Sequence, residues 1–163
     1  MTIIHTNGFE RMEIASPGYI TLQDVIAICI EWVGQRQVSI IFIDYLQLIY
    51  IENMLDKHLR IAMISEALKK LSFELEVPIF IRVPVVSANK DIITLRNLRK
   101  VGAIETFADC IMLINKLHKH SSSSNVNHTR KMLVRICKNH HGQLETIQFD
   151  SLLHIQKVQE TLT

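Results

Sequence analysis

The segment Ile40-Ile-Phe-Ile-Asp-Tyr-Leu-Gln-Leu-Ile49 decides the fold of this chain. Residues 38–43 predict a strand that is apolar on both faces, which is typical of a central parallel strand with helices on both sides. The strand ends at Asp44, so a carboxylate stands at the carboxyl edge of the predicted sheet. In nucleotide hydrolases that edge faces the phosphates, and such a carboxylate holds magnesium directly or through water.

Helical and strand patterns follow one another on both sides of this segment. Apolar residues at helical spacing predict a helix from Leu22 to Val33, with Thr21 as its N-cap and Gly34 as its stop. A second helix is expected over about residues 56–75, followed by a strand over residues 77–81. Strands separated by helices indicate an α/β architecture.

The last third of the chain has a different pattern. After a short helix opening at Gly102 we expect an apolar strand, and then two or three further strands at about residues 131–137, 144–149 and 152–158. Residues 119–129 contain four consecutive serines and predict a flexible loop. The predicted fold class is α/β, a single domain over residues 1–163 with a mostly parallel sheet flanked by helices and a C-terminal antiparallel hairpin.

Composition excludes several classes of protein. The 163 residues are 48% hydrophobic and 21% charged, which argues against disordered, collagen-like and coiled-coil chains. A formal net charge of +2 excludes a uniformly basic surface, so any nucleic-acid binding needs a local patch. The three cysteines lack CxxC spacing and predict reduced core thiols in a cytoplasmic protein: Cys29, Cys110 and Cys137.

Nothing in the sequence predicts a membrane partner. The segment MTIIHTNGFER lacks the pattern of a signal peptide. No apolar run reaches the roughly 18 residues that a membrane span requires.

The run IFIDYLQLI resembles the Walker B segment of bacterial DnaB-type replicative DNA helicases. Further segments resemble the same family in the same order: residues 64–71 (family pattern ISRxLKxLA), 74–78 (ELxVP), 98–109 (LRESGAIEQDAD) and 138–142 (KxRxG). The resemblance covers about residues 11–149 and implies the C-terminal RecA-like domain, a P-loop NTPase fold. It further implies a protein that assembles as a ring, hydrolyses Mg-ATP and moves along single-stranded DNA.

The chain departs from this family at the positions that handle nucleotide, so it resembles a truncated, degenerate copy. Its five glycines supply no Walker A motif GxxxxGK(S/T), and the family's catalytic glutamate lies upstream of the matched region. Pro84 stands where the family has a phosphate-sensing glutamine, and His140 stands where it has an arginine. We therefore expect no hydrolysis by this chain alone, and Mg-ATP, which the family implies, is doubtful as its cofactor.

The resemblance also assigns candidate site residues, each with a plainer alternative. Asp44 is the Walker B ligand for magnesium, or a strand-end carboxylate that caps a turn. Lys138 and His140 reach a neighbouring subunit's nucleotide as a finger pair, or form an ordinary hairpin turn. The DNA-binding loop, or alternatively a solvated basic face, consists of Arg96, Arg99, Lys100 and Gly102.

The missing phosphate-loop strand has a structural consequence. Its loss would uncover Ile41 and Ile43, and exposing three or four such residues would forfeit roughly 5–10 kcal/mol. We expect a replacement strand from residues 1–6, a strand from another chain, or a smaller sheet.

The sequence is compatible with four hypotheses about the function. The leading hypothesis is a DnaB-like domain, associated with DNA replication and unwinding, that binds single-stranded DNA or a helicase ring without hydrolysing ATP. The second is the distal part of a split, active ATP-dependent DNA helicase. The third is a regulator that docks on a complete DnaB hexamer, and the fourth is a remnant of a mobile element. The expected partners are single-stranded DNA and helicase subunits, or further copies of the chain itself.

Overall fold

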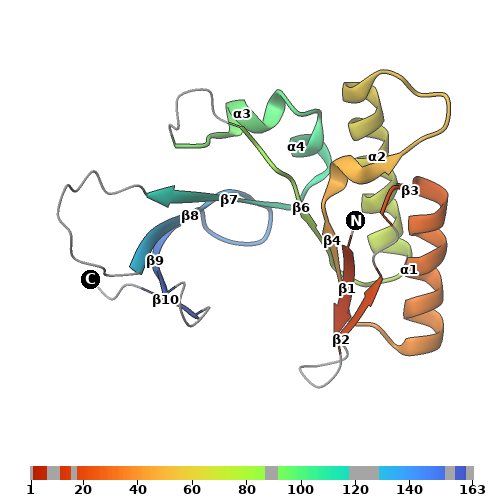
Figure 1. The fold of residues 1–163 in the computed structure, drawn as a ribbon, viewed down its shortest axis with the longest axis horizontal. Helices are drawn as coiled ribbons and strands as arrows, with labels where there is room; N and C mark the ends of the chain where they lie inside the picture. Colours follow the sequence, from red (N-terminus) through yellow and green to blue (C-terminus); the bar gives the residue numbers. More distant parts are fainter. Residues whose placement is uncertain are drawn as a thin grey trace. The chain divides into compact units, whose positions relative to one another are not determined.

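The computed structural model describes residues 2–6, 12–15, 18–86, 92–117, 129–152 and 157–160. The chain divides into two compact units (Figure 1). Unit 1 comprises Met1–Val85 with Leu98–Ala108, and unit 2 comprises Val86–Asn97 with Asp109–Thr163. The single domain predicted over residues 1–163 stays a prediction.

Unit 1 is built on a four-stranded sheet with the strand order β2-β1-β4-β6. The strands are β1 (Thr2–Thr6), β2 (Met12–Ala15), β4 (Ile40–Asp44) and β6 (Ile79–Arg82). β4 and β6 are parallel, as the sequence predicts, whereas β1 runs antiparallel to both of its neighbours. β1 pairs with β4 along its whole length, so of the three alternatives for the missing strand the structure shows the first, a strand from the start of this chain.

Two helices lie on one side of this sheet, α1 (Leu22–Arg36) and α2 (Lys57–Glu74) (Figure 1). The side chains of Ile41 and Ile43 are fully buried. They share the core with a set of large apolar side chains from both helices and from the segment after β4: Val25, Cys29, Leu46, Ile49, Ile64 and Leu68. The sequence predicts helices on both sides of β4, and this is wrong at Phe42. The alternate β4 residue Phe42 is 38% exposed, so neither α1 nor α2 covers the second face at this point.

The start of α1 is as predicted, and its end is not. The Thr21 hydroxyl oxygen accepts a hydrogen bond from the Asp24 backbone N–H, and the Asp24 carboxylate accepts one from the Thr21 backbone N–H. The predicted stop at Gly34 is wrong, because α1 continues to Arg36 and Gln37 takes the left-handed C-cap position with φ 52°. A helix accommodates an isolated glycine at a modest cost, so Gly34 alone does not end it.

Short elements complete unit 1. Two-residue strands, β3 (Ile20–Thr21) and β5 (Ile49–Tyr50), pair in parallel, and a 3₁₀ turn, η1 (Leu46–Leu48), follows β4. The short helix predicted after Gly102 is α4 (Ile104–Phe107). Helix α3 (Leu95–Arg99), which the sequence did not indicate, begins among the residues of unit 2 and ends among those of unit 1.

Unit 2 contains an antiparallel sheet with the strand order β10-β9-β8-β7. Its strands are β7 (Cys110–Leu117), β8 (Thr129–Asn139), β9 (Thr146–Leu152) and β10 (Lys157–Glu160). The predicted C-terminal hairpin is therefore present within a larger antiparallel sheet that also includes β7. Apart from Thr129, the loop predicted at residues 119–129 lies outside the described residues.

The cysteines differ in burial. Cys29 is buried in α1, and burial raises the pKa of its thiol to about 11. Cys137 is half-buried, and Cys110 is exposed, so the prediction of a core thiol is wrong for Cys110. Cys110 is the first residue of β7, where the alternation of the strand turns Ile111 inward and its neighbour outward.

The described helices include none with the length and apolarity needed to cross a membrane.

Candidate functional site

The carboxyl edge of β4 and β6 brings Asp44 next to Arg82. The two residues are direct partners in the parallel ladder, and each is the last residue of its strand. Arg82 Nε donates a hydrogen bond to Asp44 Oδ1 over 2.5 Å. Both side chains keep contact with solvent, with exposed fractions of 62% for Arg82 and 44% for Asp44. An ion pair this exposed contributes at most about 1 kcal/mol to stability.

Residues that follow the two strands complete this edge. The guanidinium carbon of Arg82 lies 5.4 Å from the centre of the Tyr45 ring, within the range of a cation–π contact. Gln47 Nε2 donates a hydrogen bond to the backbone oxygen of Pro84 over 3.2 Å. Pro84, which stands where the family has its glutamine, is thus tied to the segment after β4.

A magnesium ion does not fit these residues. Mg²⁺ takes about six oxygen ligands and is usually held by one or two carboxylates together with substrate phosphates. Here one carboxylate, that of Asp44, is already paired with a guanidinium. The described part of the chain contains no group of three His, Cys, Asp or Glu side chains that could hold a metal. The Asp44 carboxylate accepts its hydrogen bond from Arg82, on the neighbouring strand.

The predicted DNA-binding residues are divided between the units. In unit 1, Arg99 forms two hydrogen bonds with the Glu105 carboxylate, Nε to Oε2 over 2.5 Å and Nη2 to Oε1 over 2.9 Å. Its charge is therefore partly neutralised, and this pairing raises the Arg99 pKa further. Lys100 is exposed. In unit 2, Arg96 is exposed on α3.

Gly102, the fourth of these residues, is buried against α2. A Cβ atom at this position would lie 2.5 Å from Ile61 Cγ2, closer than real Cβ contacts come. The absence of a side chain therefore lets the chain pass close to α2. This is a packing reason for the glycine that is independent of any DNA contact.

Lys138 and His140 lie at the end of β8 and just beyond it, in unit 2. Lys138 faces Ile111 in the ladder with β7. The His140 backbone N–H donates to the Asp109 backbone oxygen over 3.0 Å, and His140 Nδ1 lies 3.4 Å from Asp109 Oδ1. The turn after β8 is thus fastened to the residue that precedes β7.

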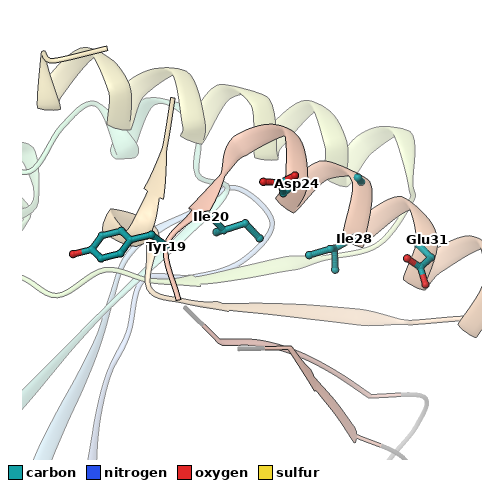
Figure 2. Close-up of a pocket in the computed structure, with 6 residues that line it drawn as sticks. Tyr19, Ile20, Asp24, Ile28 and Glu31 are labelled. Carbon is teal, nitrogen blue, oxygen red and sulfur yellow. The ribbon is translucent and has the colours of Figure 1, made fainter. Parts of the chain in front are cut away.

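One hollow that the sequence did not indicate lies along α1 (Figure 2). Its volume is about 380 Å³, and it is lined by Tyr19, Ile20, Asp24, Ala27, Ile28 and Glu31. The Asp24 carboxylate caps α1, and the Glu31 carboxylate lies 3.5 Å from Arg36 Nη2. Both acids are therefore engaged within the chain, and none of the predicted site residues lines the hollow.

Arg82 is the site residue that the sequence interpretation missed. The signal was present, because Ile79-Phe-Ile-Arg82 repeats the pattern of Ile41-Phe-Ile-Asp44, with an arginine in place of the final aspartate. Opposite charges at the ends of two neighbouring parallel strands predict an ion pair.

Comparisons with known proteins agree with this fold. A probable plasmid replicative DNA helicase of Chlamydia trachomatis is 39% identical over 125 residues, 74% of this chain and 25% of that protein. The replicative DNA helicase DnaB of Treponema pallidum is 30% identical over 131 residues, 79% of this chain and 28% of that protein. The chain thus spans little more than a quarter of the length of these relatives.

A solved structure shows the same fold. A DnaB-like replicative helicase, described with its interactions with primase, matches with a TM-score of 0.63 and 24% identity. The match covers 79% of this chain and 32% of that one. The profile of the DnaB-like helicase C-terminal domain family matches residues 6–160. The chain therefore belongs to the DnaB-like helicase C-terminal domain family, with a RecA-like α/β fold.

Proposed function

We propose that the chain is a DnaB-type domain of the DNA replication machinery that binds single-stranded DNA or helicase-ring subunits and does not hydrolyse ATP by itself. The carboxyl edge of β4 and β6 carries this proposal. There Asp44 is paired with Arg82, and the backbone oxygen of Pro84 accepts from Gln47. The sequence supplies no GxxxxGK(S/T) loop to place phosphates against this edge.

The finger position supports the same proposal. An arginine finger is worth ~10³ to 10⁵ in rate. His140 occupies that position, and an imidazole lacks the planar five-donor fork of a guanidinium. Its contacts with Asp109 hold it within its own chain.

A phosphate-release assay with Mg-ATP, with and without single-stranded DNA, tests the lack of hydrolysis. The purified chain should release no phosphate above the buffer blank, and Asp44→Ala should leave that result unchanged. Release that depends on Asp44 would contradict the proposal. A known active DnaB assayed in parallel controls for the reagents.

Binding to DNA is supported by two exposed cations, Lys100 and Arg96. Phosphate contacts need little beyond positive side chains within reach. If both neutralise phosphates of a single strand, log affinity should fall against log salt with a slope of about −1.4, from about −0.7 per contact.

Fluorescence anisotropy with a labelled oligonucleotide measures this slope. Lys100→Ala should make it shallower. Lys70→Ala is the matched control, because Lys70 is also an exposed lysine, lies on α2 and pairs with Glu66. DNA binding that does not depend on salt, or equal effects of the two variants on the slope, would contradict a role for the predicted DNA-binding loop.

Association with a helicase ring requires a separate measurement. Light scattering of the chain with and without a complete DnaB should show a complex, which Lys138→Ala should weaken if the end of β8 contacts the neighbouring subunit. An unchanged mass on mixing would remove the ring partner from the proposal.

A second candidate function, the distal part of a split helicase, is favoured by the outer strand β6. Among the described strands, β6 pairs only with β4. Phe80 of β6 and Phe42 of β4 stack with ring centres 5.0 Å apart, and both are partly exposed. Co-expression with a polypeptide that carries a phosphate loop should then give a complex with ATPase activity. Failure to form that complex would count against this candidate.

A further inference from the structure

Arg82 and Asp44 end neighbouring parallel strands in direct register, so their side chains leave the same face at the same edge of the sheet. The register therefore places a positive charge beside the carboxylate to which the family resemblance assigns a metal ion. Without any movement of the backbone, Arg82 Nε already lies within hydrogen-bond distance of Asp44 Oδ1.

The guanidinium is held from a second direction as well. The Tyr45 ring, which immediately follows Asp44 in the chain, lies 5.4 Å from the guanidinium carbon. A planar guanidinium can donate to a carboxylate and lie over an aromatic ring at the same time, which an ammonium group does less well. The combination of a carboxylate and a ring restricts where the Arg82 head group can lie.

We propose that Arg82 is the built-in counter-ion of Asp44, occupying the place of a divalent cation so that the carboxyl edge of β4 and β6 stays charge-balanced without metal. This inference deepens the proposed function and rests on it, since it gives a reason for the lack of hydrolysis. It also predicts that Arg82, and not the missing phosphate loop alone, keeps magnesium away from Asp44.

The direct test asks whether Mg²⁺ displaces Arg82 from the Asp44 carboxylate. The NMR signal of the Arg82 Nε–H group is recorded in the full chain while Mg²⁺ is added. Asp44→Asn should move this signal and define its position without the carboxylate. In the unmodified chain, millimolar Mg²⁺ should leave the signal in place. A shift on adding Mg²⁺ towards the Asp44→Asn position would overturn the proposal, because it would mean that metal displaces the arginine.

Arg99 provides a control within the same sample. Its Nε also donates to a carboxylate over 2.5 Å, from a guanidinium that is 63% exposed, but at a position to which the family assigns no metal. Glu105→Gln should move the Arg99 signal and leave that of Arg82 unchanged. A general effect of salt would move both signals on adding Mg²⁺ and is thereby separated from displacement at Asp44.

A second measurement uses Mn²⁺ as a paramagnetic probe of exposed carboxylates. Backbone signals at Asp44 and Tyr45 should escape selective broadening in the unmodified chain and should broaden in Arg82→Gln. Arg36→Gln, which removes the exposed pair with Glu31, is the matched control and should leave Asp44 unbroadened. Broadening at Asp44 in the unmodified chain, or none in Arg82→Gln, would overturn the proposal.

These tests separate this inference from the proposed function. Phosphate release that is lost in Asp44→Ala would contradict the proposed function, whatever the Arg82 signal does. An Arg82 signal that Mg²⁺ displaces, in a chain that releases no phosphate, would contradict only the counter-ion role. If Arg82→Gln does not fold, the competition experiment still decides, because it uses the unmodified chain.

Discussion

Replacing Gly102 with alanine should destabilise unit 1, although Gly102 belongs to the predicted DNA-binding loop. The added Cβ would lie 2.5 Å from Ile61 Cγ2 and 2.9 Å from Ile61 Cβ. Ile61 is 3% exposed on α2, so the clash falls on a buried side chain. Overpacking of this kind costs about 1–3 kcal/mol in the free energy of unfolding.

Gly34→Ala is the matched control for this substitution. Apart from its chain neighbours and the backbone of its own helix, no atom lies within 4 Å of a Cβ built at Gly34, which is exposed in α1. Because glycine inside a helix is less favourable than alanine, this variant should gain about 0.5–1 kcal/mol.

Urea unfolding followed by tryptophan fluorescence measures both changes. Trp32 is the single tryptophan and is 5% exposed in α1, so its emission reports on unit 1. Gly102→Ala should unfold at lower urea, and its folded fraction should bind single-stranded DNA like the unmodified chain. An unchanged urea midpoint together with weaker DNA binding would refute the packing argument.

Three further predictions concern the cap, the thiols and the exposed ion pair. Thr21→Ala should lower the free energy of unfolding in urea by about 1 kcal/mol, because it removes the hydroxyl that accepts a hydrogen bond from the Asp24 N–H. Thr21→Ser keeps a hydroxyl and should lose little stability. Burial raises the pKa of the Cys29 thiol from 9.0 to about 11. The protein therefore keeps this thiol's full contribution to stability below pH 9.0, the pKa of the thiol in the unfolded chain, and loses it as the pH rises towards about 11, its pKa in the folded chain. Cys29→Ala should remove this alkaline loss, and under native conditions a thiol reagent should modify exposed Cys110 before Cys29. Arg99→Gln should leave the urea midpoint nearly unchanged, because water screens an arginine side chain that is 63% exposed; a clearly lower midpoint would show that the pair has a structural role.

The elements of unit 1 that rest on local chemistry were predictable from the sequence. A hydroxyl residue just before a run of apolar residues at helical spacing identified Thr21 as the N-cap, and the same spacing identified α1 and α2 as helices. The unbroken apolar run before Asp44 identified β4 as a strand beside a parallel neighbour. In each case the signal lies within about one helical turn or one strand of the residue concerned.

Features that depend on distant residues were less accessible. The antiparallel pairing of β1 with β4 was one of three options, because no local pattern states which edge a strand will join. The paired strands β3 and β5 have two residues each, which is too short for an alternating hydrophobic pattern. Arg82 was overlooked because its meaning depends on register with Asp44, a residue 38 positions away. Similarly, the burial of Gly102 depends on Ile61 and not on its own neighbours in sequence.

The most direct test of the central claim is whether the edge at Asp44 holds magnesium nucleotide. Equilibrium dialysis of labelled ATP against the full chain, with and without Mg²⁺, measures this for the unmodified protein and for Asp44→Ala. We predict no Mg²⁺-dependent retention of ATP and no difference between the two proteins. Retention that requires Mg²⁺ and disappears in Asp44→Ala would contradict the account.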